Sequence, residues 1–147
     1  MKFIFQTSGL LVEDLYLFLT KCDKQFSPFL STRVNLKEYS KKLFLNSTMV
    51  HVKKNTDIIG LVAFYVNKNS QGYAFISLIC VLNEYVGNGI GSRLMEKCTT
   101  LVKNENFNSI KLEVDTLNLQ AITFYQKCGF FIEDHKQNSY LMTKLLN

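Results

Sequence analysis

The chain has 147 residues, of which 47% are hydrophobic and 20% charged, and it carries a formal net charge of +5 at pH 7. This composition excludes a disordered chain and predicts one folded domain, residues 1–147, with enough apolar residues for a core. No apolar run approaches the roughly 20 residues that span a bilayer, and the start, Met1–Gln6, is too short and too soon polar for a signal peptide, so we expect a cytoplasmic protein without membrane association.

The first half of the chain predicts a strand, two helices and an antiparallel meander. Residues 10–23 space their apolar side chains as one helical face, and Asn35 is placed to cap the next helix. The expected strands are 3–5, 48–53, 58–66 and 73–81, with turns at 55–57 and 67–72. The strand 73–81 is apolar on both faces, which is typical of the middle of a sheet with helices on each side.

The second half changes to helical periodicity at Gly89, returns to a strand at 110–114, and predicts a helix that Asn118 caps and that ends at Lys127 before Gly129. Two strands, 130–133 and 140–145, complete the order β-α-α-β-β-β-α-β-α-β-β. The chain is therefore expected to have an α/β fold of the α+β type.

The cysteines and histidines do not suggest a metal centre. Cys22, Cys80, Cys98 and Cys128 lie far apart, without a Cys-x-x-C pair or a neighbouring histidine, so we expect reduced and mostly buried thiols and no bound metal. His51 in a strand and His135 in the last hairpin receive no catalytic role.

The positive charge permits several partners. It could attract nucleic acid, an acidic membrane or a ligand with several phosphates. The lysine pairs Lys41-Lys42 and Lys53-Lys54 do not form the basic stripe with exposed aromatics that is typical of nucleic-acid binding, so no nucleic-acid partner is expected.

The most informative segment carries a strand through a glycine-rich turn into a helix. Gly87, Gly89 and Gly91 alternate there, so the backbone can curl tightly and present N–H groups, and the helix N-terminus adds about half a positive charge. A ligand with a pyrophosphate is the natural inference. A Walker loop would need Gly-Lys-Ser/Thr, whereas Gly91 precedes Ser92-Arg93, and a dinucleotide fingerprint would need a third glycine at Ser92.

The segment Val86-Gly87-Asn88-Gly89-Ile90-Gly91 resembles the coenzyme A loop of the GNAT N-acetyltransferase superfamily, R/Q-x-x-G-x-G/A. Further along, Leu112-Glu113-Val114 and the stretch from Asn118 to Phe130, with Phe124-Tyr125-Gln126-Lys127, look like that family's second signature. The resemblance covers residues 73–130. It departs from the pattern at Val86, where the family has Arg or Gln, and at Asn83, where it commonly has Pro. Because valine replaces the family's Arg or Gln at position 86, cofactor binding should lose one side-chain hydrogen bond, which is worth about 1 kcal/mol.

The resemblance implies a mixed central sheet of about seven strands flanked by about four helices, and acetyl-coenzyme A as co-substrate. It implies that one strand offers its backbone to the acetyl and pantetheine parts and that the glycine loop cradles the pyrophosphate. The residues that it assigns to the cofactor are Ile79, Cys80, Val81, Val86, Gly87, Asn88, Gly89, Ile90, Gly91, Ser92, Asn118 and Tyr125.

Direct acetyl transfer needs an acid for the leaving thiolate and a base for the amine. The resemblance places Tyr125 beside the sulfur, and a phenol with an ordinary pKa near 10 is protonated at neutral pH. Glu113 matches the glutamate of the ribosomal-protein alanine acetyltransferases and is the candidate base, with Glu84 and Asp115 as alternatives that feed a water chain. The backbone N–H after Cys80 is the candidate oxyanion donor.

The acceptor is expected to be a small primary amine such as an amino sugar. Phe26, Phe29 and Arg33 are the candidate residues of its binding wall, and Arg33 would meet an anionic group. A polyamine or a protein N-terminus as acceptor stays open, as do a non-catalytic acyl-CoA-binding regulatory module and a monomeric or homodimeric state. A nicotinamide-dependent oxidoreductase would need a further strand-helix repeat, which the sequence lacks.

Overall fold

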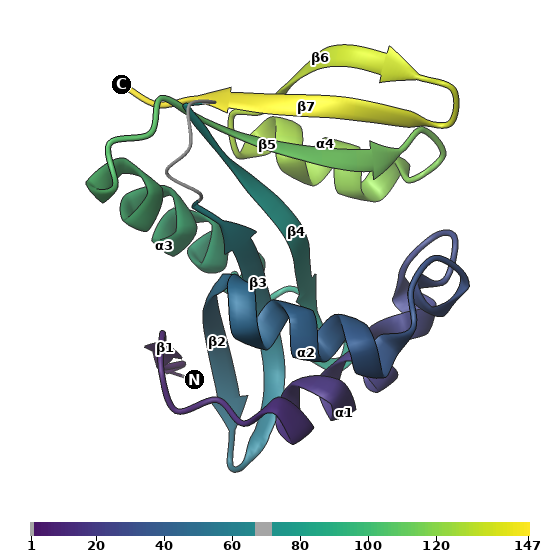
Figure 1. Ribbon diagram of the computed structural model, residues 1–147, viewed down its shortest axis with the longest axis vertical. Coiled ribbons are helices and arrows are strands. Elements are labelled where there is room, and N and C mark those ends of the chain that lie inside the picture. Colours follow the sequence, from purple (N-terminus) through teal and green to yellow (C-terminus); the bar gives the residue numbers. More distant parts are fainter. Residues whose placement is uncertain (1, 67–71) are drawn as a thin grey trace.

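The computed structural model describes residues 2–66 and 72–147. These residues form a seven-stranded mixed sheet with four α-helices, in the element order predicted above (Figure 1). The α/β fold expected from the sequence is therefore confirmed. The predicted turn at 67–72 falls almost entirely on residues 67–71, which lie outside the described residues.

The predicted elements all occur, with small changes at their ends. The α-helices are α1 (Val12–Cys22), α2 (Leu36–Asn46), α3 (Ile90–Asn104) and α4 (Leu119–Lys127), and the 3₁₀ helices are η1 (Asp23–Gln25), η2 (Leu30–Thr32) and η3 (Asn83–Tyr85). The strands are β1 (Phe5–Gln6), β2 (Thr48–Lys54), β3 (Asp57–Tyr65), β4 (Tyr73–Val81), β5 (Ser109–Asp115), β6 (Phe131–Lys136) and β7 (Ser139–Leu145). The first strand starts later than expected because only Phe5 and Gln6 pair with β2.

The sheet divides into two antiparallel parts that meet at β4 and β5. Its strand order is β1-β2-β3-β4-β5-β7-β6, and β4 and β5 are the parallel neighbours. Their pairing covers only Tyr73–Phe75 opposite Ser109–Lys111. Beyond these three pairs the two strands separate, and Figure 1 shows them starting side by side and then spreading apart.

The burial of β4 differs from the prediction in one respect. The strand does take the central position, but it is not covered on both faces: buried and half-buried residues alternate along it. The strand that is buried throughout is β3, from Ile58 to Phe64. Beyond its separation from β5, residues of both faces of β4 border the cavity described below.

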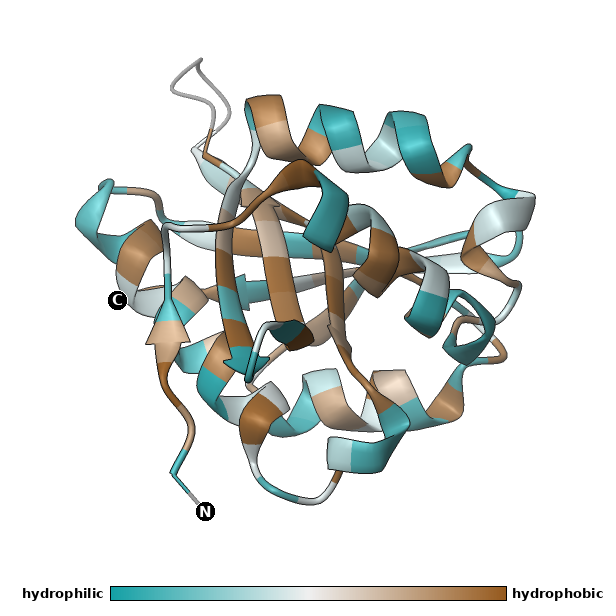
Figure 2. Ribbon diagram, turned by 90° about the horizontal axis from the view of Figure 1, so that it is seen from below, coloured by the Kyte–Doolittle hydropathy of each residue, from teal (hydrophilic) through white to brown (hydrophobic). Residues whose placement is uncertain are grey.

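The helices cover the sheet with apolar faces, and Figure 2 shows brown strands in the middle with polar residues on the outer helical turns. Leu15 and Leu19 of α1 are fully buried, as is Leu94 of α3. At about 25 cal/mol per Å² of apolar surface, each such side chain contributes about 1.5–3 kcal/mol. Helix α3 packs so closely on β3 that a Cβ at Gly60 would lie 3.1 Å from Ile90 Cγ2.

Local hydrogen bonds fix the starts of α2 and α4 and the end of α4. Asn35 Oδ1 accepts from the Glu38 N–H at 3.0 Å, and Asn118 Oδ1 accepts from the Ala121 N–H at 3.3 Å, so both predicted caps are present. Gly129 adopts φ +99° and its N–H donates to Gln126 O, while the Phe130 N–H donates to Tyr125 O. This pair of bonds is the Schellman motif, and it stops α4 two residues after Tyr125.

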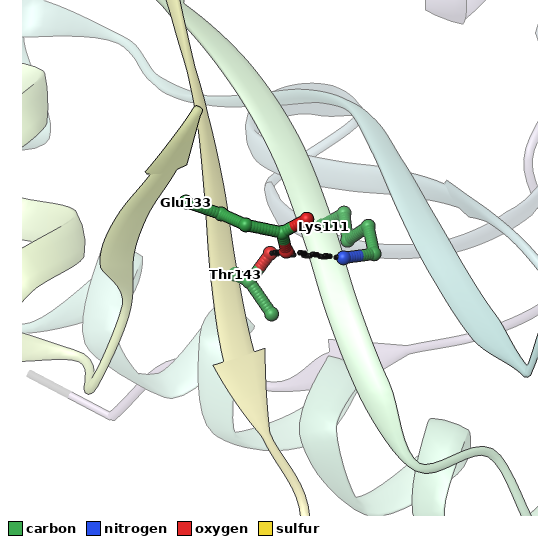
Figure 3. A network of polar contacts seen from close by, with 3 residues as sticks. All are labelled: Lys111, Glu133 and Thr143. Atoms are coloured by element: carbon green, nitrogen blue, oxygen red, sulfur yellow. Dashed lines mark hydrogen bonds and ion pairs between the residues drawn. The ribbon is translucent and has the colours of Figure 1, made fainter. Parts of the chain in front are cut away.

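A polar cluster ties the last hairpin to β5 (Figure 3). The Lys111 ammonium on β5 donates to the Glu133 carboxylate on β6 and, at 3.2 Å, to the Thr143 hydroxyl on β7, and that hydroxyl also donates to Glu133. These bonds hold the pKa of Glu133 below its ordinary value. The cluster thus joins β5, β6 and β7 to one another.

The cysteines are free, as predicted, and Cys22, Cys80 and Cys98 are buried whereas Cys128 is half-buried. His51 is also buried, at 1% exposure, so its role is packing. Among the described residues, no helix is both long and apolar enough to cross a bilayer.

Candidate active site

The separation of β4 from β5 opens a cavity of about 610 Å³. Its walls come from the far end of β4, the start of α3, β5, α4 and the connection that follows α1. The cavity therefore gathers segments that lie up to 100 residues apart, and most of the residues singled out in the sequence border it.

The glycine loop forms one end of the cavity. Gly87 and Gly89 have φ of +93° and +76°, a conformation that L side chains rarely adopt. Asn88 does not border the cavity; its Nδ2 donates to Tyr85 O at 2.9 Å and holds the turn instead. The turn is thus shaped by its own backbone and by Asn88.

The first turn of α3 presents to this end backbone N–H groups that have no partner among the described residues. The helix has no side-chain cap, unlike α2 and α4, and its first internal bond runs from the Arg93 N–H to Gly89 O. The N–H groups of Ile90, Gly91 and Ser92 precede that bond, and these residues line the cavity. Free N–H groups and the positive end of the helix dipole suit a pyrophosphate.

Gly91 serves a purpose different from that of the other two glycines. It has no positive φ, but a Cβ there would lie 3.3 Å from Phe124 Cζ and 3.9 Å from Val81 Cγ2. From their alternation, all three glycines were expected to have one role, in the tight phosphate-binding turn. The structure shows that Gly91 allows α3 to approach α4, which carries Tyr125.

The end of β4 offers backbone groups to the cavity. The Leu82 N–H donates to Ile59 O of β3 at 2.9 Å. Because N–H groups alternate in direction along a strand, those of Val81 and Ile79 point to the opposite edge, which β5 has left. Ile79, Cys80 and Val81 all line the cavity, where the resemblance placed the acetyl and pantetheine parts.

Tyr125 projects into the same cavity from α4. Its ring packs against Phe124 and Phe130, with centroids 5.7 and 6.0 Å apart, and no group of the described residues hydrogen-bonds its hydroxyl. Burial, together with the nearby thiols of Cys80 and Cys128, raises the pKa of Tyr125 well above its ordinary 10.0. The phenol is therefore protonated at neutral pH.

Glu113 also lines the cavity, from β5, and its side chain is 48% exposed. Lys136 of β6 lies 3.8 Å from its carboxylate. The alternative base Asp115 borders the cavity as well, but its Oδ1 accepts from the Leu117 N–H at 2.8 Å. Glu84 does not line the cavity.

The acceptor wall is only partly where the sequence placed it. Phe26 and Arg33 line the cavity, whereas Phe29 does not and is 45% exposed. Val86 lines it and is 56% exposed, so the departure from the family pattern leaves an apolar side chain at the rim. Asn118 lines it too, with its Oδ1 already used to cap α4.

Gln25 of η1 lines the cavity although the sequence did not predict it there, as do Ser27, Ser77, Tyr85 and Gln120. The Gln25 amide bonds the backbone at the end of β4, more than 50 residues away. A lone glutamine at the end of a helical pattern carries no sequence signal for such a contact. Phe124, known only as part of the second signature, also lines the cavity.

Comparison with known proteins places the chain in one family. A family model described as Acetyltransferase (GNAT) family matches residues 13–130. The spermidine N(1)-acetyltransferase of Thermoplasma acidophilum is 30% identical over 118 residues, which span 73% of this chain and 71% of that protein. Streptothricin acetyltransferase A of Bacillus subtilis is 34% identical over 67 residues, 46% of this chain and 39% of that protein.

The fold is matched by solved structures. The PaiA N-acetyltransferase of Thermoplasma acidophilum, crystallised with coenzyme A, superimposes with a TM-score of 0.79 at 18% identity, covering 99% of this chain and all of that one. The seven-stranded fold of this chain is thus the fold of that solved structure. The chain belongs to the GNAT acetyltransferase family.

Proposed function

We propose that this protein is an N-acetyltransferase that moves the acetyl group of acetyl-CoA to the primary amine of a small acceptor. The observation that carries the proposal is that the uncapped start of α3, the open edge of β4 and Tyr125 all border one cavity. Family membership supports acetyl-CoA as the co-substrate.

The first part of the proposed mechanism is binding. The N–H groups of Ile90, Gly91 and Ser92 receive the pyrophosphate, and the open edge of β4 receives the pantetheine and the thioester. With the thioester oxygen beside it, the Val81 N–H donates to the negative charge that develops there during attack. Removing one such donor typically costs 10²–10³ in kcat.

The second part is proton transfer. The neutral amine attacks the thioester carbon and loses a proton, for which Glu113 is the proposed acceptor, either directly or through water. As the carbon–sulfur bond breaks, the Tyr125 hydroxyl protonates the thiolate. A free thiol has an ordinary pKa near 8.5, so a proton donor beside the sulfur assists its departure near neutral pH.

The charged side chains of the cavity indicate which charge the acceptor carries. Glu113 is paired with Lys136, whereas Arg33 forms no ion pair within the described residues. An unpaired guanidinium attracts an anionic group. We therefore favour an acceptor that carries both an amine and an acidic substituent over a polyamine, which the net charge of +5 would repel.

Two measurements test the proposal. Calorimetric titration with acetyl-CoA, NAD and ATP should give binding for acetyl-CoA alone. A panel of amines, comprising an amino-sugar phosphate, spermidine and peptides with free N-termini, is then assayed for coenzyme A release. Turnover on one member names the acceptor class. Acetyl-CoA binding without turnover on any amine would favour a regulatory module, and absence of binding would refute the proposal.

A further inference from the structure

The side-chain amide of Gln25 holds the end of β4. Gln25 Nε2 donates to Val81 O at 2.9 Å, and Gln25 Oε1 accepts from the Asn83 N–H at 3.1 Å. The same Nε2 lies 3.5 Å from Cys80 Sγ. Both polar atoms of the amide thus bond to the backbone of one short segment. No other glutamine side chain among the described residues makes two such bonds.

These two bonds follow the pattern of a parallel strand. In a parallel ladder one residue donates to the carbonyl before its opposite number and accepts from the N–H after it. The Gln25 amide does this around Leu82, on the edge from which β5 has departed. A single side chain therefore stands in for one residue of the missing neighbour.

The bonded groups adjoin the proposed oxyanion donor. Val81 N–H and Val81 O lie on the same edge of β4, since both groups of one strand residue point the same way. Gln25 bonds the carbonyl and leaves the N–H facing the cavity. Fixing Val81 O and Asn83 N–H fixes the peptide planes on either side of Leu82, and so limits how β4 can turn after Cys80.

Gln25 is itself held by the connection that forms the acceptor wall. Asp23, in the same 3₁₀ helix, accepts through Oδ1 from the Ser31 N–H at 2.6 Å, which closes the loop that carries Phe26. Phe26 follows Gln25 directly and lines the cavity. The amide therefore links the acceptor wall to the strand end that receives the thioester.

We infer that Gln25 is a positioning residue for acetyl transfer: its amide replaces a strand neighbour and aims the Val81 N–H at the thioester oxygen. This inference rests on the proposed function. It requires that Gln25 act on the rate of the chemical step and leave the pyrophosphate end of the site, which lies on α3, unchanged.

The first test is Gln25→Met, which preserves side-chain length and removes both bonds. We expect kcat to fall about 10- to 100-fold, below the full effect of losing an oxyanion donor. The acetyl-CoA dissociation constant should stay within about twofold. Gln126→Met, on the exposed face of α4, is the matched control and should leave both values unchanged.

A second variant separates the two bonds. Gln25→Glu keeps an acceptor for the Asn83 N–H but places a carboxylate against Val81 O, so its kcat should fall at least as far as that of Gln25→Met. In ¹⁵N-resolved NMR spectra the Asn83 amide should keep its wild-type shift in Gln25→Glu and lose it in Gln25→Met. A role in folding alone would lower thermal stability without this selective change.

The NMR arm also separates failure of this inference from failure of the proposed function. In the wild type, acetyl-CoA should shift the Val81 amide, and in Gln25→Met that shift should shrink while the Gly91 and Ser92 amides respond as before. If the wild type binds acetyl-CoA but acetylates no amine, the proposed function is refuted. The Val81 amide shifts of wild type and Gln25→Met would still show whether Gln25 positions that N–H group. An unchanged Val81 response and unchanged kcat in Gln25→Met would overturn the inference.

Discussion

The removal of one hydroxyl, Tyr125→Phe, tests the chemistry most directly. The ring contacts with Phe124 and Phe130 persist in the variant, and the hydroxyl has no partner among the described residues, so the fold should lose less than about 1 kcal/mol. Loss of a general acid typically costs 10²–10⁴ in rate. At 1.36 kcal/mol per factor of ten, this is about 2.7–5.4 kcal/mol of transition-state stabilisation.

The assay compares kcat with the affinity for acetyl-CoA. Coenzyme A release at saturating amine gives kcat, and calorimetry gives the dissociation constant. We expect kcat to fall by at least about 100-fold while the dissociation constant changes by less than about threefold, because the hydroxyl acts only as sulfur departs. An unchanged kcat, or an equal loss in rate and affinity, would refute the assignment of Tyr125 as the acid.

Three further changes address other parts of the molecule. Glu113→Gln should lower the rate most at low pH, where the amine is most protonated, and an identical pH–rate profile would exclude Glu113 as sole base. Gly89→Ala forces φ +76° on a residue with a Cβ although the space there is open, so it should cost about 1–2 kcal/mol in thermal unfolding and weaken acetyl-CoA binding in calorimetry. Because folding lowers the pKa of Glu133, the ionised carboxylate stabilises the folded state at pH values above its ordinary pKa of 4.5. This stabilisation is lost as the pH falls through the lower pKa of the folded state. The unfolding temperatures of wild type and Glu133→Gln should therefore converge in acid, and a constant difference would contradict the cluster's role.

Local features of the fold were predictable because they depend on neighbours along the chain. The caps at Asn35 and Asn118 and the stop at Gly129 follow from hydrogen bonds that span three to five residues. The glycine loop was recognisable for the same reason, since its spacing is itself the signal. The sequence also predicted most of the residues that border the cavity.

The shape of the site depended on contacts that no local pattern encodes. β4 separates from β5 after Phe75, and buried and half-buried residues alternate along it, although its apolar sequence indicated burial on both faces. Phe29 and Asn88 were expected in the site but do not border the cavity: Phe29 is 45% exposed, and the Asn88 amide bonds Tyr85 O.

By itself, the sequence determined the family, the order of the elements and the pyrophosphate loop, because each rests on residue types at short and fixed spacings. Only the tertiary structure decided that Gly91 makes room for Phe124 and that Gln25 completes the edge of β4. Both contacts join residues more than 30 positions apart, and side chains separated in this way meet only when the sheet brings their elements together.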